Sequence, residues 1–237
     1  MSADSAAHSE HGRRSATGLF ITVEGIDGCG KSTQASLLAD ALRAAGRSVR
    51  MLREPGGTAI SEKIRALVLD PANAEMGTVC ELLLYEAARA QLVHEVIEPA
   101  LADGEVVVCD RFFDSTTAYQ AHAGGLDAAV VQRANELAVA GVVPQLTFVF
   151  DIEARRALER RADRAEADRM ELKGLAFQER VAEGFRAIAA AEPERVHLID
   201  ASGSIEEVFS RMVAALAGRM PDLLPMPLRA CGRAQQL

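Results

Sequence analysis

The stretch LFITVEGIDGCGKST, from Leu19 to Thr33, decides the class of fold. It opens as a short apolar run of strand length, passes through a glycine-rich turn and ends where an amphipathic helical pattern begins. Gly25, Gly30, Lys31 and Ser32 match the spacing G-x-x-x-x-G-K-[ST]. In that setting, backbone N–H groups and the helix N-terminus surround phosphate oxygens. The stretch therefore predicts a phosphate-binding loop, the alternative being a glycine-rich turn with an incidental lysine.

This loop predicts binding of ATP as co-substrate. Lys31 should bridge the β- and γ-phosphates, and the Ser32 hydroxyl should ligate Mg²⁺. The residues expected to contact ATP are consecutive: Gly25, Ile26, Asp27, Gly28, Cys29, Gly30, Lys31, Ser32 and Thr33. The loop alone does not separate kinases from switches or motors. A GTPase would need a guanine-reading Asn-Lys-x-Asp segment, which the sequence lacks, and large motor ATPases need a longer chain.

Beyond the loop, strand-like runs alternate with helical patterns. The expected strands are Leu19–Glu24, Ser48–Arg53, Glu105–Asp110, Leu146–Phe150 and Arg195–Ile199. The expected helices cover residues 31–45, 61–69, 79–102, 128–140, 152–162, 175–191 and 205–217. Such alternation predicts an α/β fold with right-handed crossovers, a five-stranded parallel sheet and helices on both faces. Ligands should then bind at the carboxyl ends of the strands.

Local signals mark some helix ends. Thr78 with Glu81, and Ser204 with Glu207, have capping-box spacing. Gly46 suits a helix C-terminus. We expect these residues to fix the ends of the helices beside them.

Composition favours one domain of about 200 residues. Hydrophobic residues make up 49% and charged residues 25% of the 237 residues, enough for a proper core. We expect a kinase domain at 18–219, a disordered tail at 1–17 and a second tail at 220–237. The net charge of −8 argues against a nucleic-acid partner, so anionic ligands must be held in local cationic pockets.

The cysteines and the termini suggest a location. Cys29, Cys80, Cys109 and Cys231 form no CxxC pair and no metal-ligand spacing. The N-terminal stretch has no signal-peptide run, and no segment reaches the roughly 20 apolar residues of a membrane span. We therefore expect a cytoplasmic protein without a membrane partner.

Three further segments carry polar side chains at predicted strand ends or along one helix face. REPGGT begins at Arg53, which can reach an anion at the sheet edge; an ordinary turn is the alternative. In ELLLYEAARAQ, Tyr85 and Arg89 are four apart and share a helix face. CDRFFDSTTAYQ follows a strand, and places Asp110 where a Mg²⁺ ligand belongs, with Arg111 beside it.

Together these segments resemble the thymidylate kinase family, over about residues 18 to 218. The resemblance implies a P-loop kinase with a short lid that phosphorylates dTMP to dTDP with ATP and Mg²⁺ and forms a homodimer. The residues implied to bind the acceptor are Asp27, Arg53, Tyr85, Arg89, Arg111, Ser115, Thr116, Tyr119 and Gln120. The implied metal-site residues are Ser32 and Asp110.

The resemblance also implies individual roles. Asp27 would meet the sugar 3′-hydroxyl, and Arg111 would clamp the acceptor phosphate. Tyr85, where the family usually has Phe, and Arg89 would hold thymine. Tyr119 would pack against the 2′ carbon and leave no room for a hydroxyl. The family often has an arginine in its glycine-rich continuation, which is missing or displaced in AHAGGL.

The catalytic cation is expected from a lid. Some members of the family carry a catalytic arginine where this chain has Gly28. We therefore expect the catalytic arginine within RRADRAEADR, residues 160–169. An arginine supplied at closure stabilises the charge on the transferred phosphoryl group. We expect catalytic roles for Lys31, Arg111, Arg164 and Arg160, with the other lid arginines in a solvated helix. Asp168 to Glu171 resembles the family's lid motif.

Two other functions remain open from the sequence. One is a different nucleoside-monophosphate or deoxynucleoside kinase, which would share the loop and the lid. The other is a non-kinase P-loop ATPase switch, which would hydrolyse ATP slowly without regard to an acceptor. The ring and arginine at Tyr85 and Arg89, with the Ser-Thr-x-Ala-Tyr-Gln set, favour thymidylate kinase.

Overall fold

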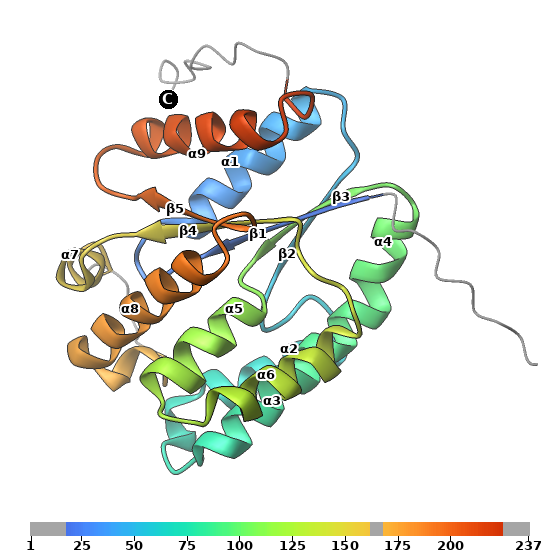
Figure 1. Cartoon of the computed structure of the whole chain (residues 1–237). Helices are drawn as coiled ribbons and strands as arrows, with labels where there is room; N and C mark the ends of the chain where they lie inside the picture. Colours follow the sequence, from blue (N-terminus) through green and yellow to red (C-terminus); the bar gives the residue numbers. More distant parts are fainter. Residues whose placement is uncertain (1–17, 162–167, 225–237) are drawn as a thin grey trace, which may run out of the picture.

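Five parallel strands form one sheet in the order β2-β3-β1-β4-β5 (Figure 1). The computed structural model describes residues 18–161 and 168–224. The strands are β1 (Leu19–Glu24), β2 (Val49–Arg53), β3 (Val106–Asp110), β4 (Leu146–Asp151) and β5 (Val196–Asp200). Thr22 of β1 pairs with Cys109 on one side and Thr147 on the other. The sheet and all five expected strands are confirmed.

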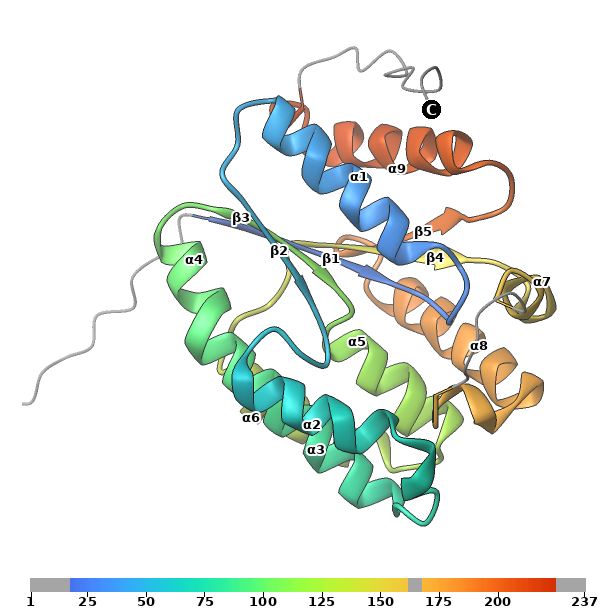
Figure 2. The same cartoon turned by 180° about the vertical axis from the view of Figure 1, so that it is seen from behind.

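Helices cover both faces of this sheet. In the two opposite views, α1 and α9 lie on one face, and the remaining long helices lie on the other (Figures 1 and 2). The α-helices are α1 (Lys31–Ala44), α2 (Ala59–Leu69), α3 (Thr78–Leu92), α4 (Glu98–Ala102), α5 (Phe113–Thr116), α6 (Ala128–Val139), α7 (Ala154–Glu159), α8 (Leu175–Ala191) and α9 (Ile205–Arg219). Short 3₁₀ turns are η1 (Pro71–Asn73) and η4 (Glu171–Lys173), and π-helical segments are η2 (Val93–Ile97) and η3 (Thr117–Ala123).

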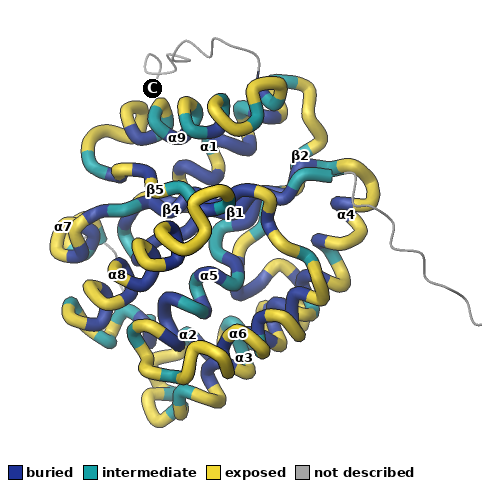
Figure 3. Tube along the Cα trace, in the orientation of Figure 1, coloured by how far each residue is buried: buried dark blue, intermediate teal, exposed yellow. Residues whose placement is uncertain are grey.

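The central strands are buried on both faces, as parallel strands under two helix layers must be (Figure 3). Alternate side chains of β3 enter different clusters. Val106 and Val108 pack in the large cluster that also holds residues of α1, α8 and α9, whereas Val107 and Cys109 pack with α3 and α4. This two-sided burial explains why the strands are apolar throughout.

Three expectations about helices are corrected. The predicted helix 79–102 contains a π-helical segment, η2, before Pro99 opens α4. Proline cannot donate the N–H that a regular helix needs at that position. Residues 113–123, which lie outside the expected helices, form α5 and η3. The predicted helix 152–162 is shorter, as α7.

The helix ends follow local chemistry with one exception. Ser204 and Glu207 form the expected capping box on α9. Gly46 has φ 81° and closes α1, its N–H donating to Arg43 O while Arg47 N–H donates to Leu42 O. The expected box at Thr78 is wrong, because α3 is capped by Gly77 and the Glu81 carboxylate bonds elsewhere.

The ends of the chain bear on the expected tails. The predicted tail 1–17 lies outside the described residues, as do residues 225–237. The part of the second tail that is described is packed: Leu224 is buried against the core, so the packed chain extends past the expected boundary at residue 219. Within the described residues, no helix is long and apolar enough to cross a membrane.

Candidate active site

A cavity of about 710 Å³ opens at the carboxyl ends of the strands. Its walls come from the loop after β1, the turn after β2, helix α3, the segment after β3 and the loops before and after the undescribed residues 162–167. A further wall comes from residues 203–208, at the start of α9. This position beside β1, the central strand, agrees with the general location of ligands in open α/β sheets.

The loop after β1 has the backbone that a phosphate cradle needs. Gly25, Gly28 and Gly30 have φ values of 137°, 87° and 94°, which side chains rarely allow. Gly30 caps α1 with no side chain over the N–H groups of the first turn. Among the described residues, the Lys31 ammonium makes long contacts of 3.4 Å to Ile26 O and to Asp27 Oδ1. The loop therefore offers its N–H groups and a weakly held ammonium to an anion.

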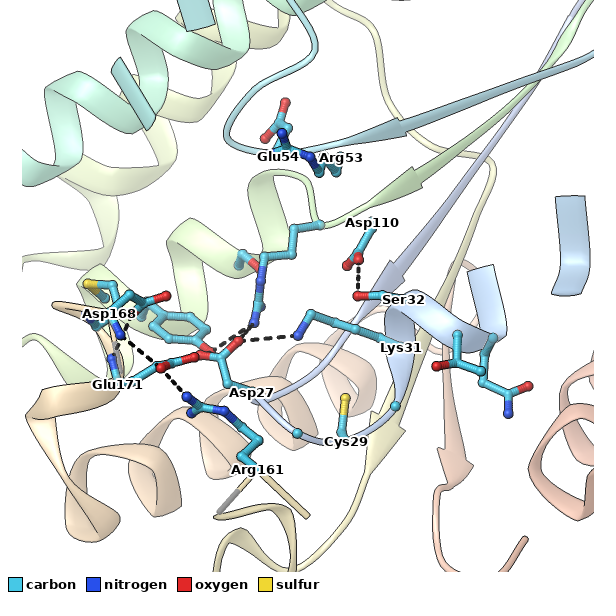
Figure 4. Close-up of a pocket in the computed structure, with 18 of the residues that line it drawn as sticks. Asp27, Cys29, Lys31, Ser32, Arg53, Glu54, Asp110, Arg161, Asp168 and Glu171 are labelled. Carbon is cyan, nitrogen blue, oxygen red and sulfur yellow. Dashed lines mark hydrogen bonds and ion pairs between the residues drawn. The ribbon is translucent and has the colours of Figure 1, made fainter. Parts of the chain in front are cut away.

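Ser32 and Asp110 meet at the sheet end of this loop (Figure 4). The Ser32 hydroxyl donates to Asp110 Oδ2. The other carboxylate oxygen, Asp110 Oδ1, is buried and has no hydrogen-bond partner in the described part of the chain. A hydroxyl beside an acceptor that lacks a partner suits a hard cation that takes its other ligands from nucleotide phosphates.

Asp27, Arg111 and Tyr119 form the centre of the cavity. Arg111 Nη2 donates to Asp27 Oδ1 at 2.6 Å and to the Tyr119 hydroxyl at 3.2 Å, and that hydroxyl lies 3.2 Å from Asp27 Oδ2. The guanidinium also lies over the Tyr119 ring. Burial alone would raise the pKa of Asp27, but the Arg111 and Lys31 cations hold it below its usual range. The cluster stays charged and sits within reach of the phosphate loop.

Arg111 is held in an unusual backbone conformation by a residue that the sequence reasoning missed. Arg111 has φ 72°, and the turn after it is bonded to the buried carboxylate of Glu24. Glu24 accepts hydrogen bonds from Phe112 N at 2.7 Å and from Ser115 Oγ at 2.6 Å. Burial, and secondarily Asp114, raise the pKa of Glu24 to about 8. A charged residue ending an otherwise apolar strand was the only available signal.

Arg89 lines the cavity, is almost fully buried and is paired with two acids. Glu54 accepts from its Nε at 2.8 Å, and Glu86 pairs with Nη1. Burial would lower the pKa of Arg89, but these carboxylates raise it. Arg89 Nη1 also donates to the Thr116 hydroxyl at 2.9 Å. The ion network fixes the guanidinium in one orientation over the Phe112 ring, and Tyr85, one helical turn before Arg89, lines the same cavity.

The other predicted acceptor residues line the same cavity. Arg53 contributes to its rim but is half exposed and paired with Glu62 at 3.0 Å. Ser115 donates to Glu24 and accepts from Arg111 Nη1 at 3.0 Å. Gln120 donates from Nε2 to Glu81 Oε1 at 2.8 Å. The fold thus brings together residues from α3, α5 and η3 that the sequence separates.

The arginines of the expected lid lie in different places and have different partners. Arg164 lies outside the described residues. Arg160 Nη1 donates to Ala201 O at 3.2 Å, toward β5. Arg161 pairs with Glu171 and faces Asp27 across the loop (Figure 4). Arg169 points away from the phosphate loop, because its Nε donates to Val68 O and its Nη2 pairs with Glu81.

Arg161 and Gly28 are close neighbours. A Cβ atom on Gly28 would collide with Ala157 O and would lie 2.9 Å from Arg161 Cγ. A side chain longer than glycine at this position would therefore displace α7. The sequence placed Arg161 among the lid arginines without giving it a role, and its nearness to the loop depends on how α7 packs.

The wall from 203 to 208 was also missed. Gly203, Ser204, Ile205 and Val208 line the cavity beyond the loop, with Gln34 of α1, whose Nε2 donates to Ile205 O at 3.0 Å. Apart from the helix cap at Ser204, these residues carry no motif, because an apolar slot can be built from many side chains. They extend the cavity away from Arg111.

A phosphate loop with a metal-suited Ser–Asp pair on one side, and a charged and aromatic pocket on the other, defines a P-loop kinase of a small phosphorylated acceptor. The comparisons with known proteins specify the family. The family model described as thymidylate kinase matches residues 23–212. The chain belongs to the thymidylate kinase family.

Individual relatives agree with this assignment. A thymidylate kinase from Exiguobacterium sibiricum is 48% identical over 196 residues, which cover 83% of this chain and 92% of the relative. One from Citrifermentans bemidjiense is 46% identical over 212 residues, covering 87% and 94%. The crystal structure of thymidylate kinase from Ehrlichia chaffeensis matches with a TM-score of 0.68 at 34% identity, over 84% of this chain and 98% of that one.

Proposed function

We propose that this chain transfers the γ-phosphoryl group of ATP to dTMP, giving ADP and dTDP. The observation that carries the proposal is the Asp27–Arg111–Tyr119 cluster lying against the phosphate loop. An acceptor phosphate on Arg111 would stand next to the phosphates held by Lys31. A simple ATPase switch has no use for a buried second phosphate site with an aromatic wall.

The chemistry then depends on position and charge. The nucleophile is an oxygen of the dTMP phosphate, which is anionic at neutral pH, so no general base is needed. Arg111 would orient that phosphate in line with the donor, and Lys31 would neutralise charge between the two. Arg111 remains a cation throughout, because Tyr119 and Asp27 raise its pKa against the effect of burial.

The nucleoside of dTMP fits the remaining pocket. Tyr85 would stack on thymine, and Arg89 would donate to a base carbonyl from its fixed position. Ser115, Thr116 and Gln120 complete the wall. The Tyr119 ring, edge-on to Phe185 and tilted against Phe177, is packed too firmly to move aside for a 2′-hydroxyl. This packing supports selection of deoxyribose.

On the donor side, Ser32 and Asp110 would hold Mg²⁺, directly or through water. The orphaned, buried Asp110 Oδ1 fits such a cation. When bound, the ion would neutralise charge on the ATP phosphates. The apolar slot at Ile205 and Val208, beyond the loop, would take the adenine.

The transition-state cation would come from the lid arginines. Arg160 and Arg164 are the positions that the family resemblance favours. Arg161 joins them here, because it lies across the loop from Asp27 and beside Gly28. Closure of these cations over the phosphates would also exclude water, the competing acceptor.

One assay tests the proposal. ADP release is measured with ATP and Mg²⁺ alone, and with added dTMP, dUMP, UMP, AMP or CMP. We expect release to depend on an acceptor and to be fastest with dTMP. A preference for another nucleotide would mean a different monophosphate kinase, and release that ignores acceptors would mean an ATPase switch.

We also propose that the chain works as a homodimer in the cytoplasm. Helices α2 and α3 pack side by side, and their outer sides carry exposed apolar side chains, including Ile60, Leu67, Val79 and Leu83. Exposed apolar side chains on two neighbouring helices support a protein interface. Cys29, Cys80 and Cys109 are free thiols, which suits a reducing compartment.

The dimer is tested by replacing Leu83, which is 59% exposed, with aspartate. We expect sedimentation to change from dimer to monomer while the monomer stays folded by circular dichroism. As a matched control, Leu198→Asp changes an exposed leucine of β5, far from α3, and should leave the mass unchanged. A wild-type protein that sediments as a monomer would contradict the proposal.

A further inference from the structure

Glu81 is a buried carboxylate that the phosphate chemistry does not use. It lies on α3 and is 1% exposed. Gln120 Nε2 donates to its Oε1 at 2.8 Å, and Arg169 Nη2 pairs with its Oε2 at 2.6 Å. Lys173 Nζ lies 3.0 Å from both oxygens. Glu81 therefore joins α3, η3 and the segment around η4 at one point.

This carboxylate is ionised in the folded protein. Burial alone would raise the pKa of Glu81, but the donors around it, Gln120 and Lys173 first and then Arg169, lower it. An ionised carboxylate has acceptor oxygens only. Every group that touches it must therefore present a hydrogen.

That requirement fixes the orientation of the Gln120 amide. A side-chain amide can be turned over without changing its shape, so its neighbours decide which end is nitrogen. Because the Glu81 carboxylate can only accept, the NH₂ end of Gln120 must face it. The Gln120 oxygen, Oε1, must then point the other way, away from the Glu81 carboxylate. Gln120 lines the cavity, so the atom it offers to a ligand is an acceptor.

A donor lies on the same wall. Arg89 donates to the hydroxyl of Thr116, which is four residues before Gln120. With Arg89 as donor and Gln120 Oε1 as acceptor, the pocket complements a carbonyl next to a ring N–H. Thymine has that edge, whereas the cytosine ring has a 4-amino group and an N3 lone pair, the opposite pattern.

We infer that Glu81 is a positioning residue for base specificity: by fixing the polarity of Gln120, it makes the cavity select a pyrimidine with a ring N–H. This inference rests on the proposed function, since it concerns how the same site reads its acceptor. Glu81 does not touch the base and acts only through Gln120.

The substitution Glu81→Gln should reverse the polarity. Arg169 and Lys173 will hold the new carbonyl oxygen, because both are donors. The new amide nitrogen then faces Gln120, which must turn its own oxygen toward it and present NH₂ to the cavity. A hydrogen bond to thymine N3–H becomes a clash of donors, while cytosine N3 gains a donor.

The experiment compares kcat/KM for dTMP and for 5-methyl-dCMP. The second nucleotide keeps the 5-methyl group and differs from dTMP only at position 4 and N3 of the base, where the hydrogen-bond donors and acceptors are exchanged. Wild type should strongly prefer dTMP. In Glu81→Gln, we expect the ratio of the two values to fall by about tenfold or more, the effect of an unpaired polar group in a buried site. Glu81→Asp, which keeps the charge, should retain the preference. Lys173→Met, which removes a different partner of Glu81, should retain it also.

The outcomes separate the possible roles. If Glu81 only supports the fold, both acceptors lose activity together and the ratio stays, which overturns the inference. If Glu81→Gln does not fold, wild type decides: comparable use of dTMP and 5-methyl-dCMP overturns the inference, and strong preference together with its retention in Glu81→Asp supports it. If wild type does not phosphorylate dTMP at all, the proposed function itself fails.

Discussion

The donor side and the acceptor side of the cavity are built in different ways. Gly25 to Ser32 supply the donor side from one strand, one turn and one helix start, with backbone groups as the main ligands. The acceptor side combines α3, α5, η3 and residues 168–171, and holds Arg89 with the buried acids Glu54 and Glu86. Backbone N–H groups need only the right local conformation, whereas a buried guanidinium needs partners from elsewhere in the fold.

Because of this difference, we expect substitutions on the two sides to have different effects. On the donor side, a substitution should affect chemistry and leave the rest of the site intact. On the acceptor side, a substitution also leaves a buried partner without its counter-charge, so binding, orientation and stability change together.

Lys31→Met should lower kcat by about 10³, because it removes a preorganised positive charge at the transferred group. Binding of dTMP should stay unchanged, since the acceptor cluster keeps Arg111. Steady-state rates and calorimetric titration with dTMP provide the two measurements. Weakened dTMP binding would show that the two sides are coupled more tightly than their construction suggests.

Arg111→Ala should lower kcat/KM for dTMP by about 10², with ATP still bound. The variant loses the phosphate clamp and leaves Asp27 without its closest cation, which lies 2.6 Å away in the wild type. Arg111→Lys keeps the charge but not the forked geometry, and should recover part of the loss. Undiminished turnover in the alanine variant would remove Arg111 from the mechanism.

Arg161→Ala should lower kcat by about tenfold and leave the KM values nearly unchanged, because Arg160, which also lines the cavity, keeps a second cation beside it. Arg155→Ala, an exposed arginine on α7, is the matched control and should have no effect. Arg160→Ala and Arg164→Ala in the same assay rank the three. A rise in KM for ATP without a fall in kcat would make Arg161 a binding residue only.

Glu24→Gln tests the acceptor side through stability. The pKa of Glu24 is raised to about 8 from an ordinary 4.5, so the folded state binds a proton that the unfolded state releases. The contribution of Glu24 to the free energy of unfolding is present in full below pH 4.5, its ordinary pKa. That contribution is lost as the pH rises through about 8, the pKa in the folded protein. The free energy of unfolding should fall by a few kcal/mol across that window in wild type, and by less in the variant.

Denaturant melts at about pH 5 and about pH 8.5 measure that difference. Equal pH dependence in both proteins would contradict a protonated Glu24. The variant keeps an acceptor for Phe112 N–H, so a large loss of dTMP turnover in it would point instead to the charge on Glu24 as part of the Arg111 clamp.

The sheet, its flanking helices and the phosphate loop could be predicted from runs of consecutive residues. Buried parallel strands are apolar on both faces, and glycines mark the positive φ angles of the loop, so both leave patterns in consecutive residues. The sequence also indicated Tyr85, Arg89, Arg111 and Gln120 by resemblance, and the fold gathers all four around one cavity.

The tertiary structure decided which partner each buried charge has. Glu81 had the spacing of a cap, yet it binds Gln120 and Arg169 instead, because α3 begins after Gly77 and carries its carboxylate into the interior. Glu54 gave no sequence signal for the arginine that it supports, and Glu24 gave only its place at the end of an apolar strand. A buried ion pair depends on distance in space, and residues that meet from different elements leave no fixed spacing along the chain.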